Sequence, residues 1–220
     1  MENSHFPSIQ TRPTFLLLLL LLIISNQTQI FSAASRIPKS PAGIRKNTEY
    51  VRTSCSTTSY PRLCYNSLSV YASKIKTNPK TLALAALHVN LAAARSSAAS
   101  MRRLAKTHGL RRREASAISD CVEEVGDSVF ELQRAIRELG RPRGYDFGSL
   151  ISDIETWVSS ALTDEETCME GFGGRRVNGV NSVKAKVRRH IVRVTHLTSN
   201  SLALINSYAS SAAAEEGVFP

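Results

Sequence analysis

The 220-residue chain lacks the sequence motifs by which most enzymes are identified. It has no G-x-S-x-G, H-E-x-x-H, P-loop or G-x-G-x-x-G sequence. Its histidines are scattered away from the cysteines and no C-x-x-C pair is present, which argues against a metal site. Gly126-Asp127-Ser128 resembles the start of a lipase motif, but it lies inside a predicted helix, where no nucleophile elbow can form. We therefore expect no catalytic residue, no cofactor, no metal and no enzymatic activity.

Aromatic residues are scarce, at 6%, and no alternation of polar and apolar residues predicts a strand. Basic clusters such as Arg111-Arg112-Arg113 contribute to a net charge of +10, but no aromatic residues are interleaved with them for base stacking. This pattern argues against nucleic acid as a partner. It favours an extracellular polyanion or an acidic protein surface, although the arginines could equally form solvated helix faces.

No apolar run is long enough to span a membrane. The run Phe15 to Ile24 is ten residues long, follows Arg12 and precedes the small residues Ser32-Ala33-Ala34. This arrangement is typical of a secretory signal peptide, which we predict over residues 1–34. The mature protein is therefore expected to be secreted.

Beyond the signal peptide the chain is expected to form four parts. The predicted parts are a flexible lead-in (35–47), an N-terminal helical hairpin (48–76), a four-helix bundle (77–208) and a disordered tail (209–220). The hairpin is too short to be stable alone, and we expect it to project from the bundle as an arm with a binding role. Alternatively, it covers one end of the bundle.

Four long helices are predicted because apolar residues recur every three or four positions between glycine and proline breaks. They span about 78–107, 111–139, 146–170 and 181–208. Short connections favour antiparallel neighbours, so the predicted fold is all-α, an up-down-up-down four-helix bundle.

The four cysteines would meet an oxidising compartment, where disulfides form, and they allow three pairings. The short separation of Cys55 and Cys64 favours a local bridge, which leaves Cys121 with Cys168. Those two would lie level on antiparallel helices. In the chain-entropy model, the short and the long bridge would stabilise the folded protein by roughly 3 and 4 kcal/mol, respectively.

The third predicted helix carries a row of acidic and hydroxyl residues. With a step of about 100° per residue and Cys168 facing inward, Trp157 and Asp164 also face inward. The residues expected to point outward are Glu155, Ser159, Thr163, Glu166 and Glu170. This row could contact a partner, or it could simply be solvated.

The sequence from about Tyr50 to Tyr208 resembles the plant invertase and pectin methylesterase inhibitors. The resemblance rests on CSTTSYPRLCYNSL, DCVEEVGDSVFEL, DIETWVSSALTDEETCMEGF and LTSNSLALINS. It implies a four-helix bundle with an N-terminal helical hairpin, and cysteines paired first with second and third with fourth. It also implies reversible, noncovalent 1:1 inhibition of a cell-wall enzyme in the apoplast, with the bundle lying across the substrate cleft.

The target implied by the resemblance is pectin methylesterase. The connection Gly140 to Ser149 lacks the Pro-Lys-Phe tripeptide typical of invertase inhibitors, and Thr163 matches an interface threonine of the methylesterase branch. Three alternatives remain: inhibition of cell-wall or vacuolar acid invertase, a processing or chaperone role in trans, and a structural protein that binds pectin through its basic surface.

Overall fold

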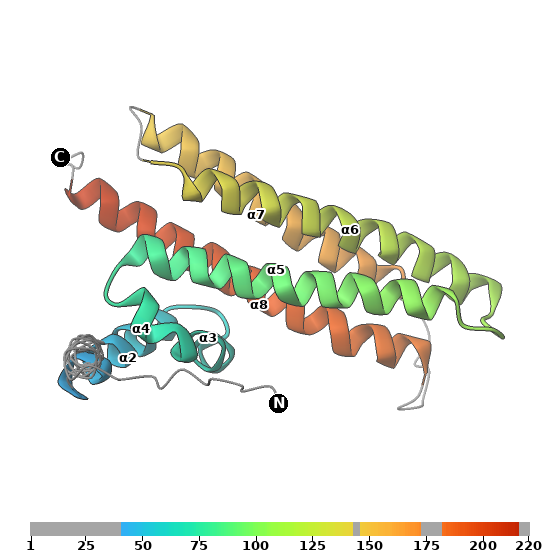
Figure 1. The fold of residues 1–220 in the computed structure, drawn as a ribbon. Coiled ribbons are helices and arrows are strands. Elements are labelled where there is room, and N and C mark those ends of the chain that lie inside the picture. Colours follow the sequence, from blue (N-terminus) through green and yellow to red (C-terminus); the bar gives the residue numbers. More distant parts are fainter. Residues whose placement is uncertain (1–40, 143–145, 173–181, 216–220) are drawn as a thin grey trace, which may run out of the picture. The chain divides into compact units, whose positions relative to one another are not determined.

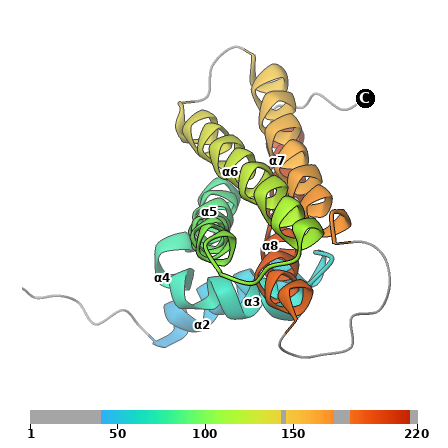
Figure 2. The same cartoon turned by 90° about the vertical axis from the view of Figure 1, so that its right-hand side faces the viewer.

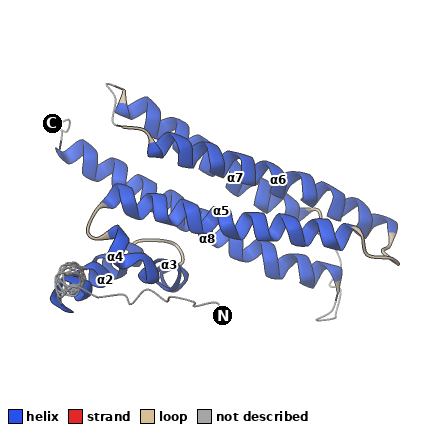
Figure 3. Cartoon of the chain, viewed as in Figure 1, coloured by secondary structure: helices blue, strands red, loops and turns tan. Residues whose placement is uncertain are grey.

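A computed structural model describes residues 41–142, 146–172 and 182–215, all within one compact unit (Figure 1). Every regular element in these ranges is a helix, which confirms the predicted all-α class (Figure 3). Within the same ranges, no helix is both long and apolar enough to cross a bilayer. The predicted signal peptide, 1–34, lies outside the described residues.

Four long helices form the bundle: α5 (Pro79–Ala105), α6 (Arg112–Gly140), α7 (Phe147–Glu170) and α8 (Val183–Glu215). Each runs antiparallel to the one before it, and α8 returns to pack against α5 (Figures 1 and 2). The predicted up-down-up-down topology is therefore confirmed.

Local signals in the sequence place the helix starts. The side chain of Asn78 accepts a hydrogen bond from the Thr81 backbone N–H at 2.8 Å, and Pro79 occupies the first turn of α5. Asp146 caps α7 in the same way, accepting from the Ser149 N–H at 3.1 Å. Between α5 and α6, Gly109 adopts a φ of 80°, which glycine tolerates readily.

The bundle core consists of two apolar clusters. The first contains Leu87, Leu132, Ile154 and Ile205, and the second contains Met101, Ile118, Val125 and Ile191. On α6 and α7, a buried polar residue separates the two clusters along the helix: Ser128 and Glu165. The core is thus interrupted by polar groups that need hydrogen-bond partners.

The arm comprises α2 (Pro41–Ser56), α3 (Pro61–Leu68), η1 (Ser69–Tyr71) and α4 (Ala72–Ile75). A third apolar cluster joins it to the bundle, and it includes Val51, Leu68 and Ile75 of the arm, Leu82 of α5 and Leu204 of α8. The expectation of a projecting arm is therefore wrong: the arm packs along α5 and α8 (Figure 2). Helices this short need the bundle to complete their core.

Both ends of the described unit are more helical than the sequence indicated. Helix α2 begins at Pro41, inside the expected flexible lead-in (35–47). Helix α8 continues to Glu215, and Ala212 is only 1% exposed in the bundle core, so the expected disordered tail (209–220) is helical as far as Glu215. Alanine gives no apolar periodicity, yet it has the highest helix propensity and fits a close contact. Residues 35–40 and 216–220 lie outside the described ranges.

Candidate functional site

Two disulfides cross-link the described structure, one within the arm and one between α6 and α7. Cys55 is bonded to Cys64, with Cα atoms 5.5 Å apart, and Cys121 of α6 is bonded to Cys168 of α7, with Cα atoms 4.4 Å apart. This is the pairing that the cysteine spacing favoured. All four cysteines are buried. Because α6 and α7 are joined covalently, a partner that binds their outer surface meets a fixed pair of helices.

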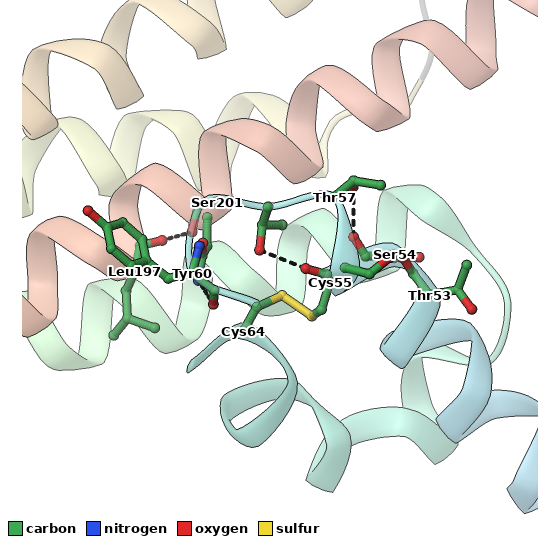
Figure 4. Close-up of a disulfide and its surroundings, with 11 residues drawn as sticks. Thr53, Ser54, Cys55, Thr57, Tyr60, Cys64, Leu197 and Ser201 are labelled. Atoms are coloured by element: carbon green, nitrogen blue, oxygen red, sulfur yellow. Dashed lines mark hydrogen bonds between the residues drawn. A yellow bond between two sulfur atoms is a disulfide. The ribbon is translucent and has the colours of Figure 1, made fainter. Parts of the chain in front are cut away.

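The loop closed by Cys55 and Cys64 binds α8. At its tip, the Tyr60 backbone N–H donates to Asn200 Oδ1 at 2.9 Å and the Tyr60 carbonyl accepts from Asn200 Nδ2 at 3.0 Å. The Tyr60 ring stacks on His196, with centroids 3.5 Å apart. Figure 4 shows this loop beside the turn of α8 that carries Leu197. The Cys55–Cys64 disulfide therefore closes the loop by which the arm packs on α8 of the bundle.

Replacing Asn200 with alanine is expected to loosen the arm and leave the bundle folded. Asn200 is only 2% exposed, and its loss removes two hydrogen bonds, each contributing about 1 kcal/mol. Amide hydrogen exchange in residues 57–63 should become at least about tenfold faster in Asn200→Ala. Asn66→Ala, an exposed amide in α3, is the matched control. Unchanged exchange in Asn200→Ala would contradict the docking role.

Four of the five residues predicted to face outward from α7 do so. Ser159, Thr163, Glu166 and Glu170 are exposed, and we call these four the α7 polar stripe. The Thr163 hydroxyl donates to the Ser159 carbonyl at 3.1 Å, which keeps it on the helix surface. Glu155 is half-buried, and the amide of Asn206, oriented to donate, reaches its Oε1 at 3.0 Å. Glu155 therefore contacts α8 and is less accessible than the stripe.

The inward face of α7 is rotated relative to the predicted one. Val158 and Glu165 are fully buried, whereas Trp157 and Asp164 are only half-buried. The buried residues are centred roughly 50° around the helix from Cys168. Cys168 bridges to α6 and therefore lies at the margin of the inward face. Taking it as the centre of that face rotated the predicted set of inward residues away from the observed one.

A buried polar network joins all four helices of the bundle. Glu165 of α7 is 0% exposed and accepts a hydrogen bond from Ser128 of α6 at 2.7 Å. The Thr198 hydroxyl of α8 lies 2.8 Å from Glu165 Oε2, and Asn90 of α5 donates to that hydroxyl at 2.9 Å. The network supplies partners for polar groups that would otherwise be unsatisfied.

Burial has the largest effect on the pKa of Glu165. Removal from water raises its pKa to about 8, although the hydrogen bonds from Ser128 and Thr198 act in the opposite direction. The carboxyl group is therefore neutral at mildly acidic pH. Sequence reasoning missed this residue; the available signal was its spacing, four residues after Ala161 and three before Cys168 on the inward side.

A second carboxyl pair lies where α6 meets α7. Glu131 Oε2 and Asp164 Oδ2 are both buried and, within the described part of the chain, have no hydrogen-bond donor. Burial, followed by the negative charge of Glu131, raises the pKa of Asp164 to about 7. The carboxyl group of Asp164 is therefore largely protonated at mildly acidic pH.

The outer surface of α6 and α7 also carries an aromatic and arginine cluster. The Arg134 guanidinium lies 4.4 Å from the Trp157 ring centroid and 5.8 Å from that of Phe130, which is 55% exposed. Arginine and large aromatic residues contribute much of the energy at protein interfaces. Sequence reasoning did not single out Phe130 or Arg134, because neither breaks the helical pattern.

The charges of this surface are suited to binding a partner. Across the described ranges, no group of three His, Cys, Asp or Glu side chains could hold a metal ion. The whole of α7 contains no lysine or arginine, so the carboxylates of its polar stripe have no cation on their own helix. The surface is accordingly complementary to a basic partner.

Comparison with known proteins gives the family. Residues 49–204 match the family described as plant invertase/pectin methylesterase inhibitor. The chain is 50% identical over 167 residues to Pectinesterase inhibitor 10 of Arabidopsis thaliana, covering 74% of this chain and 52%, or about half, of that relative. It is 42% identical over 190 residues to the 21 kDa protein of Daucus carota, covering 85% and 97% of the two chains.

A crystal structure of mutant form A of a pectin methylesterase inhibitor from Arabidopsis has a similar fold. It superposes with a TM-score of 0.55 at 21% identity, covering 69% of this chain and 92% of that one. From the extent of the sequence match and these identities, the chain belongs to the plant invertase/pectin methylesterase inhibitor family.

Proposed function

We propose that this chain is a secreted inhibitor of pectin methylesterase. It binds the enzyme noncovalently as a 1:1 complex over the substrate cleft and slows the de-esterification of pectin in the cell wall, without chemistry of its own. The observation that carries this proposal is the 50% identity to a protein named as a pectinesterase inhibitor. That name also favours methylesterase over invertase as the target.

The proposed contact surface is the outer side of α6 and α7. Its centre is the α7 polar stripe. The exposed Phe130 and the cation of Arg134 lie beside Trp157, roughly 120 to 180° around α7 from the stripe, and the Cys121–Cys168 bridge holds the two helices together. A fixed surface lowers the entropy lost on binding, because few side chains and no helices have to be ordered. Carboxylates and hydroxyls on α7 would pair with basic and polar groups at the rim of the enzyme's cleft.

The proposed function is tested by enzyme inhibition. The mature recombinant protein is expected to reduce ester hydrolysis by a plant pectin methylesterase on methylated pectin at mildly acidic pH. Acid invertase, assayed with the same protein preparation, should keep full activity. Inhibition of invertase without inhibition of methylesterase would overturn the choice of target.

A substitution at Thr163 tests the contact surface. Thr163→Ala removes an exposed side chain at the centre of the α7 polar stripe, and we expect inhibition to weaken by about tenfold, as for a typical interface hot spot. Thr156→Ala is the matched control for helix stability, because Thr156 is also exposed and its hydroxyl bonds a carbonyl one turn earlier in the same manner. Helicity should be equal in both variants. An unchanged inhibition constant in Thr163→Ala would exclude that residue from the interface.

A further inference from the structure

A groove with a volume of about 580 Å³ lies along α8, next to the start of the arm's helix α3. Its cationic lining comes from Arg188, Arg189 and Arg193, and its apolar lining from Leu63 of the arm together with Ala185 and Val192. His196, stacked on Tyr60, lines it further along α8. The groove is separate from the outer surface of α6 and α7, since none of its lining residues belongs to those helices.

The charge of this groove is not neutralised by its own helix. The first turns of α8 also carry Lys184 and Lys186, and the sole acidic residue of α8 is Glu215, at its far end. Arg188 and Arg193 are exposed and have no carboxylate partner among the residues that the structure describes. Such a cluster attracts an anionic ligand and can bind carboxylates through paired N–H donors.

The shape of the groove favours a linear ligand. From Ala185 to His196 its lining extends along α8 for roughly 16 Å, at about 1.5 Å per residue. Leu63, Ala185 and Val192 provide an apolar surface between the arginines. A ligand that suits this arrangement is extended, carries carboxylates at intervals, and has C–H faces that can lie on the apolar side chains.

We propose that this groove binds a short stretch of de-esterified pectin, a linear chain of galacturonate units. The carboxylates would pair with Arg188, Arg189 and Arg193, and the sugar rings would lie over Val192 and Leu63. The choice of galacturonate rests on the proposed function, because removal of methyl esters from pectin leaves this polycarboxylate as the product. The inhibitor would thus be retained where the reaction that it inhibits has already proceeded.

This proposal also gives the docked arm a role. Leu63 forms the arm side of the groove, and its position depends on the Tyr60 loop that Asn200 and His196 hold against α8. The local bridge between Cys55 and Cys64 closes that loop. The bridge therefore contributes to a binding site for the polymer as well as to the packing of the arm.

The experiment measures binding of unesterified oligogalacturonides to the mature protein by calorimetry at low ionic strength. The groove variant Arg188→Gln/Arg193→Gln is compared with Arg112→Gln/Arg113→Gln, in which two exposed arginines at the start of α6 are lost with the same change of net charge. We expect binding to weaken at least about tenfold in the groove variant and less than about twofold in the control. Fully methyl-esterified oligomers should bind wild type much more weakly.

Three outcomes would overturn the proposal: no binding by the wild type, equal losses in the two variants, or equal binding of esterified and unesterified oligomers. An assay of methylesterase inhibition with the same variants separates this proposal from the proposed function. Both variants are expected to inhibit as well as wild type. If the groove variant lost inhibition and kept oligomer binding, the groove would be an enzyme contact, which would also overturn the proposal.

Discussion

Raising the pH from 4.5 to 8 is expected to lower the free energy of unfolding by on the order of 4 kcal/mol through Glu165 alone. In the unfolded chain this carboxyl group has its ordinary pKa of 4.5, and in the folded protein burial raises the pKa to about 8. Between these two pH values the folded state binds a proton that the unfolded state has already released. The stabilisation is therefore fully present below pH 4.5 and is lost as the pH rises toward 8.

The thermal midpoint of the wild type should fall accordingly, by roughly 10 °C over this range, for a domain of this size. Glu165→Gln keeps the shape and an acceptor for Ser128 but cannot ionise, so its midpoint should fall much less. A smaller decline should remain, because the raised pKa of Asp164 acts in the same direction. Glu166→Gln, an exposed neighbour, is the matched control and should follow the wild type.

Circular dichroism melts at half-unit pH intervals would check this prediction. A wild-type midpoint that is constant from pH 4.5 to 8 would show that Glu165 is not buried in its neutral form. Equal declines in the wild type and Glu165→Gln would assign the pH dependence to other carboxyls, of which the Glu131 and Asp164 pair is the nearest alternative.

Removal of the bridge between α6 and α7 is expected to have a comparable effect on stability. In Cys121→Ala/Cys168→Ala the free energy of unfolding should fall by about 4 kcal/mol, because the bridge closes a long loop of the unfolded chain. The sequence separation of these cysteines is 47 residues, compared with 9 for the arm bridge. Loss of buried sulfur contacts in the second core cluster adds to the effect.

The matched control is Cys55→Ala/Cys64→Ala, in which the closed loop is much shorter. The control should lose about 3 kcal/mol or less, and its loss should appear first as faster hydrogen exchange in the arm. Denaturant unfolding monitored by circular dichroism measures both variants. A larger destabilisation from the arm bridge than from the α6–α7 bridge would contradict the loop-entropy explanation.

The fold was largely predictable, because its main determinants are local. Apolar residues at intervals of three and four, with Asn78 before Pro79 and Gly109 between helices, placed four long helices, and every bound except the end of α8 lies within about two residues of the observed one. The antiparallel order followed from short connections. The end of α8 was missed because alanines leave no periodic signal, even though Ala212 packs in the core.

The candidate contact surface was less predictable, because it depends on how each helix is rotated about its axis. The inward face of α7 was predicted by taking Cys168 as its centre. The observed inward face is rotated away from Cys168, because that residue points sideways to its disulfide partner on α6. Because of this rotation, Glu165 was not predicted to be buried. Its carboxyl group is tolerated in the core because Ser128 and Thr198 hydrogen-bond to it. Asn200 bonds the arm and Arg134 reaches Trp157 on α7, and no local pattern could reveal these contacts.

Helix α7 has carboxylates and no cations, whereas the first turns of α8 have cations and no carboxylates. This unequal distribution gives the protein a permanent dipole moment, which would orient it before contact with any charged neighbour. A cationic enzyme and an anionic polymer would then approach along different directions. On the two proposals made above, an enzyme bound at the α7 polar stripe would leave the arginines of α8 accessible, and the protein would join that enzyme to the polymer.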